Sequence, residues 1–326
     1  LLKKTGEASY RTAMEKLNDY ADRITQSVIA TLKPGRSVFS DTLDDDGKGS
    51  KNIKLEVSLN IHSSYVELDF TGCSDQVPGN LNCPEAVAAA ASYYCFRCLM
   101  PADVPACAGL FRRIKLITRK GSIVNANRPA AVAAGNVETS TRLVDLVFGA
   151  LAMTLPKRIP AASQGTMNNL TFGNKRYQYY ETICSGSPAG ISPTGEGFNG
   201  VAAVHTHMTN TRMTDPEILE QRYPVILKEF RIDRDSGGKG KYNAGDGITR
   251  TITFLEDMQC SILSGHRITP PFGLNGGEAG RIGRNWLTKP NGEQQDLAGC
   301  EHTAVNAGDS ISIQSPTGGG FGKADV

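Results

Sequence analysis

The 326-residue sequence lacks any continuous apolar run of the ~18 residues that a membrane-spanning helix requires. Its longest apolar segment, residues 143–155, is interrupted by Asp145 and Gly149. An excess of charge of one sign is also lacking, because 35 Lys and Arg nearly balance 33 Asp and Glu, for a net charge of +2. No basic block indicates nucleic-acid binding. We therefore expect neither a membrane nor a nucleic acid among the partners.

The sequence also lacks an initiator methionine and, after residues 1–4, the short apolar segment of a secretory signal. We therefore expect a cytoplasmic protein that begins partway into a longer chain. In that compartment the eight cysteines are expected to be reduced thiols. Cys95 and Cys98 lie in an apolar helical stretch, without the preceding strand or second cysteine pair that redox and zinc sites need. A structural role is favoured for this pair, with a redox or metal role as the alternative.

Hydrophobic periodicity predicts helices and a hairpin in the first part of the chain. Apolar residues at three- and four-residue spacing indicate an amphipathic helix over residues 5–33. Strict alternation over 53–61 and 66–70 predicts two antiparallel strands with one buried face. Residues 84–100 and 139–155 are apolar enough to form two buried helices.

Capping signals mark two helix starts in the middle of the chain. Thr139 or Ser140 is the expected N-cap of the second buried helix, because a hydroxyl side chain can accept a hydrogen bond from a free N–H group of the first turn. A further short helix is predicted over residues 215–223, with Asp215 as its N-cap and Pro216 in its first position.

Glycine is abundant, at 35 residues, and most of it follows Pro188. Many glycines indicate many turns, which favours a β-rich second part. The predicted fold is therefore α+β, with an α+β subdomain over 1–222 that carries most of the polar loops and a glycine-rich, mostly antiparallel subdomain over 223–326. The strands predicted in the second subdomain are 225–232, 248–255, 260–264, 286–288 and 310–314.

Three segments, residues 134–140, 160–171 and 205–212, are dense in hydrogen-bonding side chains and lack the apolar periodicity of core elements. Carboxamides and hydroxyls suit a neutral planar ligand, because an amide ring offers one donor and one acceptor that Asn or Gln can match. The alternative is that these side chains only cap helices and bridge turns. We expect the segments to meet in one polar cavity. Its substrate-binding candidates are Asn136, Gln164, Asn168, Asn169 and Asn210.

Two histidines, His205 and His207, are two residues apart and would share a face if their segment were a strand. One of them could act as an acid or base, and the two could share a metal, although a metal needs further ligands. Burial of one histidine among satisfied partners is the alternative. Residues 44–47, Asp-Asp-Asp-Gly, lack the ligand spacing and flanking helices of a calcium loop, so a solvated turn is predicted there. No metal site is predicted within this chain.

Several stretches, taken together, resemble the hydantoinase B/oxoprolinase family. The likeness extends over nearly the whole chain, in which the middle and late stretches are most similar to the 5-oxoprolinase branch, and it indicates the C-terminal portion of a B-type subunit. The matching stretches are GNVETSTRLVDLVFGALA at 135–152, PAASQGTMNNLTFG at 160–173, AVHTHMTNTRMTDPEILEQRYPV at 203–225, SGGKGKYNAGDGITR at 236–250, PPFGLNGGEAG at 270–280 and SPTGGGFG at 315–322.

The resemblance implies a two-part, oligomeric enzyme that opens cyclic amides with the help of ATP. A hydantoinase A-type partner, or an equivalent region of a fused chain, would bind ATP and phosphorylate the lactam oxygen. The B-type part would then add water to the activated imidate. The substrate would be a hydantoin or 5-oxo-L-proline, which gives L-glutamate in glutathione metabolism. Family members carry acidic and histidine residues that resemble metal ligands further upstream, so a divalent metal is expected to be bound outside this chain.

In that scheme Glu138, His205 and His207 are the catalytic candidates, because a carboxylate or an imidazole could position the attacking water while the carboxamides hold the ring. Two alternatives remain open. The same scaffold resembles that of carboxylases of the acetone and acetophenone type, which join activated bicarbonate to a ketone. The chain could also be a non-catalytic fragment that only assembles with partner chains.

Overall fold

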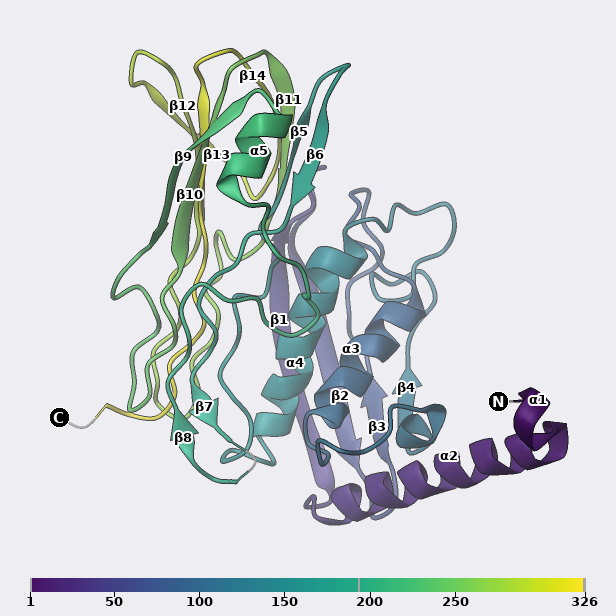
Figure 1. Cartoon of the computed structure of the whole chain (residues 1–326). Helices are drawn as coiled ribbons and strands as arrows, with labels where there is room; N and C mark the ends of the chain where they lie inside the picture. The colour runs from purple at the N-terminus through teal and green to yellow at the C-terminus, as the bar shows by residue number, and fades with distance from the viewer. Residues whose placement is uncertain (1, 193, 325–326) are drawn as a thin grey trace.

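The computed structural model describes residues 2–192 and 194–324, and Figure 1 shows two bodies side by side. The first body has helices packed on a four-stranded sheet, and the second consists mainly of two antiparallel sheets. The predicted α+β, β-rich fold class is therefore confirmed, including the two buried helices in the middle of the chain.

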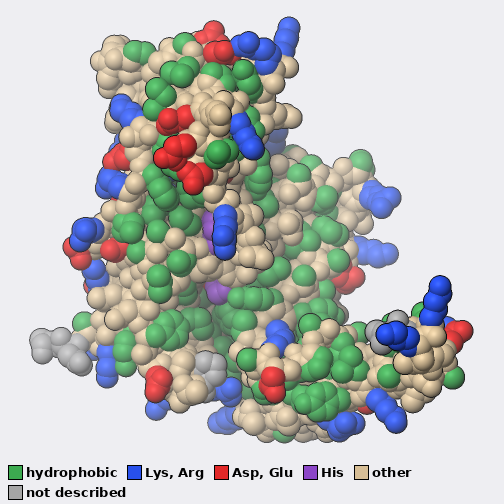
Figure 2. Space-filling view, in the orientation of Figure 1, with side chains coloured by type: hydrophobic (Ala, Val, Ile, Leu, Met, Phe, Trp, Pro, Cys, Tyr) green, Lys and Arg blue, Asp and Glu red, His purple; other side chains and the backbone are tan. Residues whose placement is uncertain are grey.

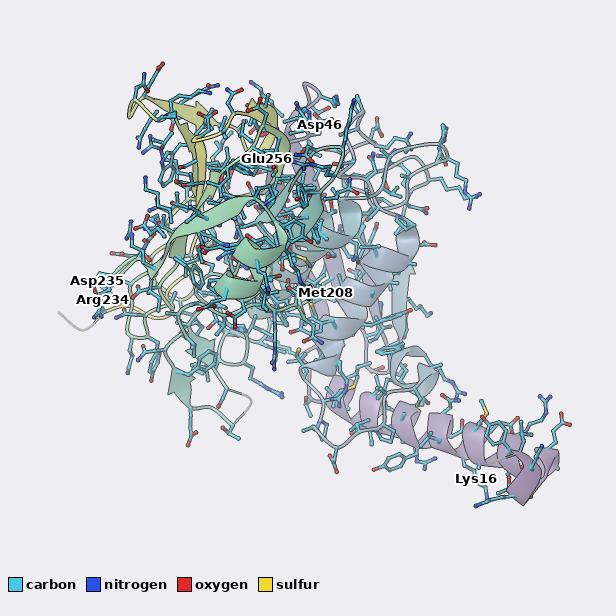
Figure 3. The ribbon with its side chains drawn as sticks, turned by 45° about the horizontal axis from the view of Figure 1, so that its top comes forward. Lys16, Asp46, Met208, Arg234, Asp235 and Glu256 are labelled. Atoms are coloured by element: carbon cyan, nitrogen blue, oxygen red, sulfur yellow. The ribbon has the colours of Figure 1, made fainter. Side chains whose placement is uncertain are left out.

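The first body is built on a sheet with the strand order β1-β2-β3-β4, in which β3 and β4 are parallel and the other neighbours antiparallel. Its elements are α1 Leu2–Thr5, α2 Glu7–Ala30, β1 Gly35–Asp45, β2 Lys51–Ile61, β3 Val66–Asp69, α3 Glu85–Arg97, the 3₁₀ helix η1 Ala108–Phe111, β4 Ile114–Ile117, the π-helical turn η2 Gly135–Thr139 and α4 Ser140–Ala152. Every residue of α4 is buried, because this helix packs on β1, β2 and α3. The first half of α2, which carries Lys16, projects away from the body (Figures 1 and 3).

Hydrophobic alternation does not predict β1, because the apolar side chains of this strand do not all face the core. Ser37 is buried and donates its hydroxyl to the carbonyl of Ala150 in α4 at 2.9 Å, whereas Val38 is 43% exposed. The helix can approach this strand closely because Gly149 has no side chain. The ring of Phe39 occupies the space where a Cβ at that position would lie, with ring atoms 2.5 Å from it.

The prediction of a solvated turn at residues 44–47 is wrong, because Asp44 and Asp46 are both buried. The Asp44 carboxylate accepts hydrogen bonds from three consecutive backbone N–H groups of residues 267–269, at 2.6 to 3.2 Å. Asp46 likewise accepts from the N–H of Gly79 at 2.9 Å and from two N–H groups of its own turn. The two carboxylates therefore tie the end of β1 to distant segments instead of facing water.

The second body is a sandwich of two sheets, with strand orders β13-β12-β15-β10-β9 and β14-β11-β5-β6. Apolar side chains from both sheets form one shared core. The strands are β5 Asn169–Gly173, β6 Gln178–Glu181, β9 Val225–Ile232, β10 Ile248–Phe254, β11 Met258–Leu263, β12 Arg284–Thr288, β13 Gln294–Leu297, β14 Cys300–Val305 and β15 Ser310–Gln314. The short pair β7 Gly190–Ile191 and β8 Gly197–Phe198 and the helix α5 Pro216–Arg222 complete it.

One sheet of the sandwich crosses the predicted boundary between residues 222 and 223. Strands β5 and β6 precede this boundary, yet β5 pairs with β11, which follows it. The division of the chain at 222/223 stays a prediction, and the contacts between the two parts are extensive.

Thr139 and Asp215 occupy the predicted N-cap positions of α4 and α5, but neither makes a capping hydrogen bond with its side chain. The hydroxyls of Thr139 and Ser140 both donate to backbone carbonyl groups, because α4 continues directly from the helical turn η2 and has no extended residue before it. The helix α5 does begin at Pro216 as predicted.

Within the described residues, no helix is both long and apolar enough to span a bilayer. The cysteines are free thiols, so Cys95 and Cys98 are not bonded to each other. Cys95 lies in α3, where burial raises the pKa of its thiol well above the ordinary value. A thiol that stays protonated is a poor nucleophile and metal ligand, which agrees with the structural role that the sequence favours.

Candidate functional site

Glu138 lies in the π-helical turn η2 of the first body, and its side chain contacts Asn169 of β5 in the second. The turn packs against a neighbouring loop at Gly135, where a Cβ would lie 2.3 Å from the carbonyl oxygen of Asn82. This close approach places Glu138 inside the protein, where its side chain is only 2% exposed. π-helical turns are rare and often occur at functional positions.

One oxygen of the Glu138 carboxyl is held by three donors. Oε1 accepts hydrogen bonds from the hydroxyl of Thr166 at 2.8 Å, from the backbone N–H of Met167 at 3.1 Å and from the carboxamide of Asn169 at 2.7 Å. The carboxyl group therefore has a fixed orientation, with Oε2 directed to the other side, where Glu138 lines a narrow pocket together with Gly265.

Burial raises the pKa of the Glu138 carboxyl to about 7, because the charged form loses its hydration. The hydrogen bonds from Thr166 and Met167 and the positive charges of Arg142 and Arg267 act in the opposite direction, but burial outweighs them. A carboxyl group with a pKa near neutrality can accept and release a proton at physiological pH, which is the property required of a general base.

The raised pKa predicts how stability depends on pH. Because the pKa of Glu138 rises from 4.5 to about 7 on folding, the protonated carboxyl favours the folded state. That contribution is fully present below pH 4.5 and is lost as the pH rises through about 7. It corresponds to about 3 kcal/mol. Urea unfolding at pH 5 and pH 8 should show a smaller loss of stability in Glu138→Gln than in the wild type, and equal losses would contradict the assignment.

Three of the predicted carboxamides, Gln164, Asn168 and Asn169, form a buried network next to Glu138. Asn168 donates to the side-chain oxygen of Gln164 at 3.0 Å, and its own oxygen accepts from the guanidinium of Arg267 at 3.0 Å. The oxygen of Asn169 accepts from the hydroxyl of Tyr180 at 2.7 Å. These carboxamides therefore have protein partners, which favours a role in holding the site together.

His207 contacts side chains of the helices α3 and α4. Its Nδ1 lies 3.2 Å from the hydroxyl of Tyr94, and its Nε2 lies 3.5 Å from Oδ1 of Asp145 in α4. Asp145 in turn accepts hydrogen bonds from the backbone N–H and the hydroxyl of Ser163, at 2.9 and 2.8 Å. Met208, labelled in Figure 3, packs against the core of the first body. The third polar segment therefore contacts the second through Asp145.

The structure corrects one expectation about the histidine pair. The segment around His205 is a loop, and His207 has a left-handed backbone with φ of 55°, so the two side chains do not share the face of a strand. His205 is partly buried, and burial lowers the pKa of its imidazole. Figure 2 shows histidine atoms near the middle of the visible face. Asn136 and Asn210 are exposed, unlike the buried carboxamides.

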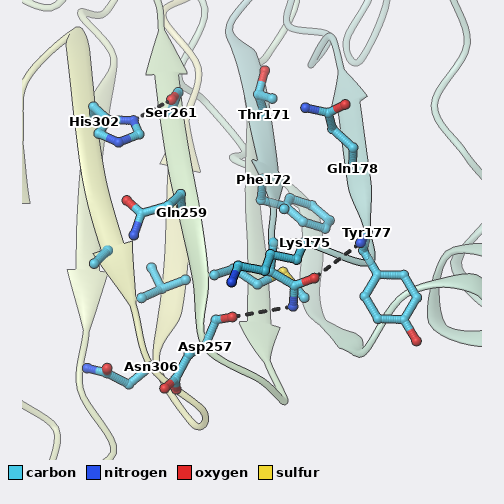
Figure 4. A pocket seen from close by; sticks show the side chains of 15 residues that line it. Thr171, Phe172, Lys175, Tyr177, Gln178, Asp257, Gln259, Ser261, His302 and Asn306 are labelled. Atoms are coloured by element: carbon cyan, nitrogen blue, oxygen red, sulfur yellow. Dashed lines mark hydrogen bonds between the residues drawn. The ribbon is translucent and has the colours of Figure 1, made fainter.

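A large pocket lies away from this network, on the sheet β14-β11-β5-β6 (Figure 4). It has a volume of about 760 Å³, and none of the predicted site residues lines it. Ser261 and His302, which do line it, are cross-strand neighbours joined by a hydrogen bond of 2.8 Å. The largest dimensions of a pocket are therefore no guide to the predicted site here, because the polar groups of that site are packed inside the protein.

Comparison with known proteins identifies the family. The sequence profile of hydantoinase B/oxoprolinase matches residues 1–324. The chain belongs to the hydantoinase B/oxoprolinase family. It is 43% identical over 311 residues to 5-oxoprolinase 1 of Arabidopsis thaliana, a match that covers 95% of this chain and 23% of that protein. The chain thus spans about a quarter of the length of this relative.

Two solved structures share the fold. The ATP-dependent caprolactamase from Pseudomonas jessenii superposes with a TM-score of 0.81 at 21% identity, covering 99% of this chain and 57% of that one. A nucleotide-free acetone carboxylase superposes with a TM-score of 0.78 at 17% identity, covering 93% of this chain and 47% of that one. At these identities the likeness establishes the fold and not the reaction.

The sequence patterns did not predict several residues of the polar network. Arg142 and Asp145 lie on the apolar helix α4, and His266 and Arg267 follow β11. Arg142 and Asp145 were detectable as the two charged residues of a helix that is otherwise apolar, since a charge is rarely buried without a specific partner. His266 gave no comparable signal, because its segment contains no periodicity that predicts burial.

The network offers no evident metal site. Among the residues that the structure describes, no group of three or more His, Cys, Asp or Glu side chains could hold a metal ion. The side chains that meet here are one carboxyl, several carboxamides and hydroxyls, and buried guanidinium groups, which together suit proton transfer and the binding of neutral polar groups.

Proposed function

We propose that this chain forms the ring-opening part of an ATP-dependent cyclic amide hydrolase and that its substrate is 5-oxo-L-proline, converted to L-glutamate. The 43% identity to a plant 5-oxoprolinase supports this substrate class. A hydantoin, ring-opened in the same way, is the nearest related substrate. In the cell the protein would act in the cytoplasm, within glutathione metabolism, as part of a multi-subunit assembly.

The observation that carries the proposal is the environment of Glu138. Its carboxyl is buried, fixed at Oε1 by three donors and shifted to a pKa of about 7. An unactivated amide is a poor electrophile, so the enzyme has to activate the carbonyl oxygen and then add water to the carbon. Glu138 can take the proton from that water, a role worth roughly 10²–10⁴-fold in rate.

ATP would be used by a hydantoinase A-type partner, which transfers a phosphoryl group to the lactam oxygen. This chain would act on the activated lactam. A divalent metal, if the complete enzyme binds one, would take its ligands from outside the described residues, because these contain no suitable group. Every role assigned to this chain concerns its own side chains.

His207 is the second catalytic candidate in this proposal. Its contact with Asp145 at 3.5 Å and with the Tyr94 hydroxyl at 3.2 Å would let it deliver a proton to the ring nitrogen as the amide bond breaks. His205 lies two residues away in the same loop and would support it. The buried carboxamides of Gln164, Asn168 and Asn169 would keep the site in shape, and the exposed Asn136 and Asn210 are proposed to meet the substrate.

The experiment is a coupled assay on the whole protein, combined with its ATP-binding partner. We expect glutamate to form from 5-oxoproline only when ATP is present, and His207→Ala to slow it. Ketone- and bicarbonate-dependent ATP turnover without glutamate would instead identify a carboxylase, the activity named for one structural neighbour. Binding of the partner without any turnover of ATP or substrate would indicate that the chain only assembles with other chains, and it would overturn the proposal.

A further inference from the structure

A narrow pocket reaches the Glu138 carboxyl. Its volume is about 10 Å³, close to the ~10–15 Å³ that one water molecule requires. A cavity of this size admits water and excludes a lactam ring. Its lining residues are Leu43, Asp44, Asp45, Leu81, Glu138, Ser264, Gly265 and Cys300.

Two polar atoms converge beside Gly265, which lines this pocket together with Glu138. A Cβ at Gly265 would lie 3.1 Å from Nη2 of Arg142 and 3.3 Å from Oε2 of Glu138. Both atoms therefore face the same small region, and one water molecule lying further out from the Gly265 backbone can reach both with hydrogen bonds of about 3 Å. The backbone of Gly265 does not have a left-handed conformation, so the glycine is not required by its backbone angles. Because glycine has no side chain, space remains between the donor on Arg142 and the acceptor on Glu138.

The guanidinium of Arg142 has unused donors at this place. The side chain is completely buried, and its Nη1 donates to the carbonyl of Thr42 and lies 3.6 Å from the carboxylate of Asp41. Its Nε and Nη2 have no hydrogen-bond partner within the described part of the chain. A buried donor without a partner costs about 1–3 kcal/mol, so a bound water that accepts from Nη2 would remove a substantial penalty.

His266 completes the surroundings of Arg142 on the other side. Its Nδ1 contacts the carbonyl of Thr269, which can only accept, so Nδ1 carries the proton and Nε2 has a free lone pair. Burial and the charge of Arg142 hold the pKa of His266 well below the ordinary value, which keeps the imidazole neutral. A Cβ at Gly165 would lie 2.5 Å from Nε2 of His266 and 3.1 Å from Nε of Arg142. The guanidinium is therefore enclosed between two glycines.

We propose that Arg142 Nη2 and Glu138 Oε2 bind a water molecule beside Gly265, and that this is the water added to the activated lactam. The inference rests on the proposed function and deepens it by assigning Arg142 as a positioning residue. Arg142 donates a hydrogen bond to the water oxygen, which leaves the remaining lone pair free to attack. Glu138 accepts one water proton.

The addition step balances without any further reagent. The water oxygen forms a bond to the ring carbon of the O-phosphorylated lactam, and the carbon–nitrogen double bond of this imidate becomes a single bond. Glu138 takes one proton from the water and passes it to the ring nitrogen, and the phosphoryl group stays on its oxygen in this step. Neither oxidation nor reduction occurs.

Two substitutions at Gly265 test the water site. Gly265→Ala places a methyl group 3.1 Å from Nη2 of Arg142 and 3.3 Å from Oε2 of Glu138, so the space that the water needs between these two atoms is filled. Gly265→Ser places a hydroxyl there, which can take over the hydrogen bonds of the water but cannot be consumed. We expect both variants to lose at least 10-fold in kcat with little change in KM, and the serine variant to be the more stable of the two.

The assay uses the whole protein with its ATP-binding partner, ATP and 5-oxoproline. Ser261→Ala is the control and should retain the wild-type rate, because the Ser261 hydroxyl faces the large pocket and contacts His302 instead of the Glu138 network. If the serine variant is as active as the wild type, the water is only structural and the inference is overturned. Unchanged kcat in the alanine variant overturns it as well. In both cases glutamate still forms, so only the water site is contradicted. A wild-type protein that forms no glutamate would instead contradict the proposed function.

Discussion

Replacing Glu138 by Gln is expected to lower the rate of ATP-dependent ring opening by about 10²–10⁴-fold, while the protein stays folded. The carboxamide of glutamine has the shape of the carboxyl group but cannot accept a proton from water. The variant therefore removes the general base and almost nothing else, which makes it sharper than an alanine substitution.

The local geometry explains why the fold should tolerate Glu138→Gln. All three groups that contact Oε1 are donors, namely the Thr166 hydroxyl, the Met167 N–H and the Asn169 carboxamide. The amide oxygen of glutamine can accept from the same three groups and leave its NH₂ group in place of Oε2, toward the narrow pocket. The buried charge disappears at the same time, so the stability of the variant at pH 8 should match or exceed that of the wild type.

The pH profile provides the decisive measurement. Because the pKa of Glu138 is about 7, the wild-type kcat should rise with pH up to about 7 and level off above it, as more of the base is ionised. The residual activity of Glu138→Gln should lack this step. Glu256→Gln, a change of the same chemistry at a surface position, is the matched control and should preserve both the rate and the profile. A step at pH 7 that persists in Glu138→Gln would assign it to another group.

The sequence predicts the elements whose hydrophobic pattern agrees with their burial. The periodicity of 139–155 predicts α4, and the predicted strand 225–232 coincides with β9. Strand β13 is missed because three of its four residues are exposed and polar, and such a strand has no apolar face for a pattern to reveal. Which strands become neighbours is also beyond local patterns, as the pairing of β5 with β11 across some 90 residues illustrates.

The candidate site is predictable where polar residues cluster in the sequence and unpredictable where they come from core elements. The composition of the second polar segment indicates Gln164 and Asn169, and both do lie in the buried network. Arg142 lies outside the polar segments, so their composition does not indicate it, and only its charge within an apolar helix marks it. Its environment depends on two glycines that lie 23 and 123 residues further along the chain and leave room for it.

The ion pair between Arg250 and Glu181 is expected to have the largest effect on stability. Arg250 on β10 donates two hydrogen bonds to the Glu181 carboxylate on β6, at 2.7 and 3.0 Å, and the two side chains are 1% and 3% exposed. The pair thus joins the two sheets of the sandwich through its interior. Arg250→Ala should destabilise the protein by about 3–5 kcal/mol, because it leaves a buried carboxylate with no compensating charge.

A double substitution separates the net contribution of the ion pair to stability from the loss of stability caused by removing one partner. In Arg250→Met combined with Glu181→Leu, both charges are removed and apolar groups of similar size fill the space, so most of the lost stability should return. Arg284→Ala, which breaks an exposed ion pair with Asp296 on the neighbouring strand, should change the urea midpoint little. If Arg250→Ala were as mild as Arg284→Ala, water would have to reach Glu181, and the two sheets could not be closed around this pair as the structure shows them.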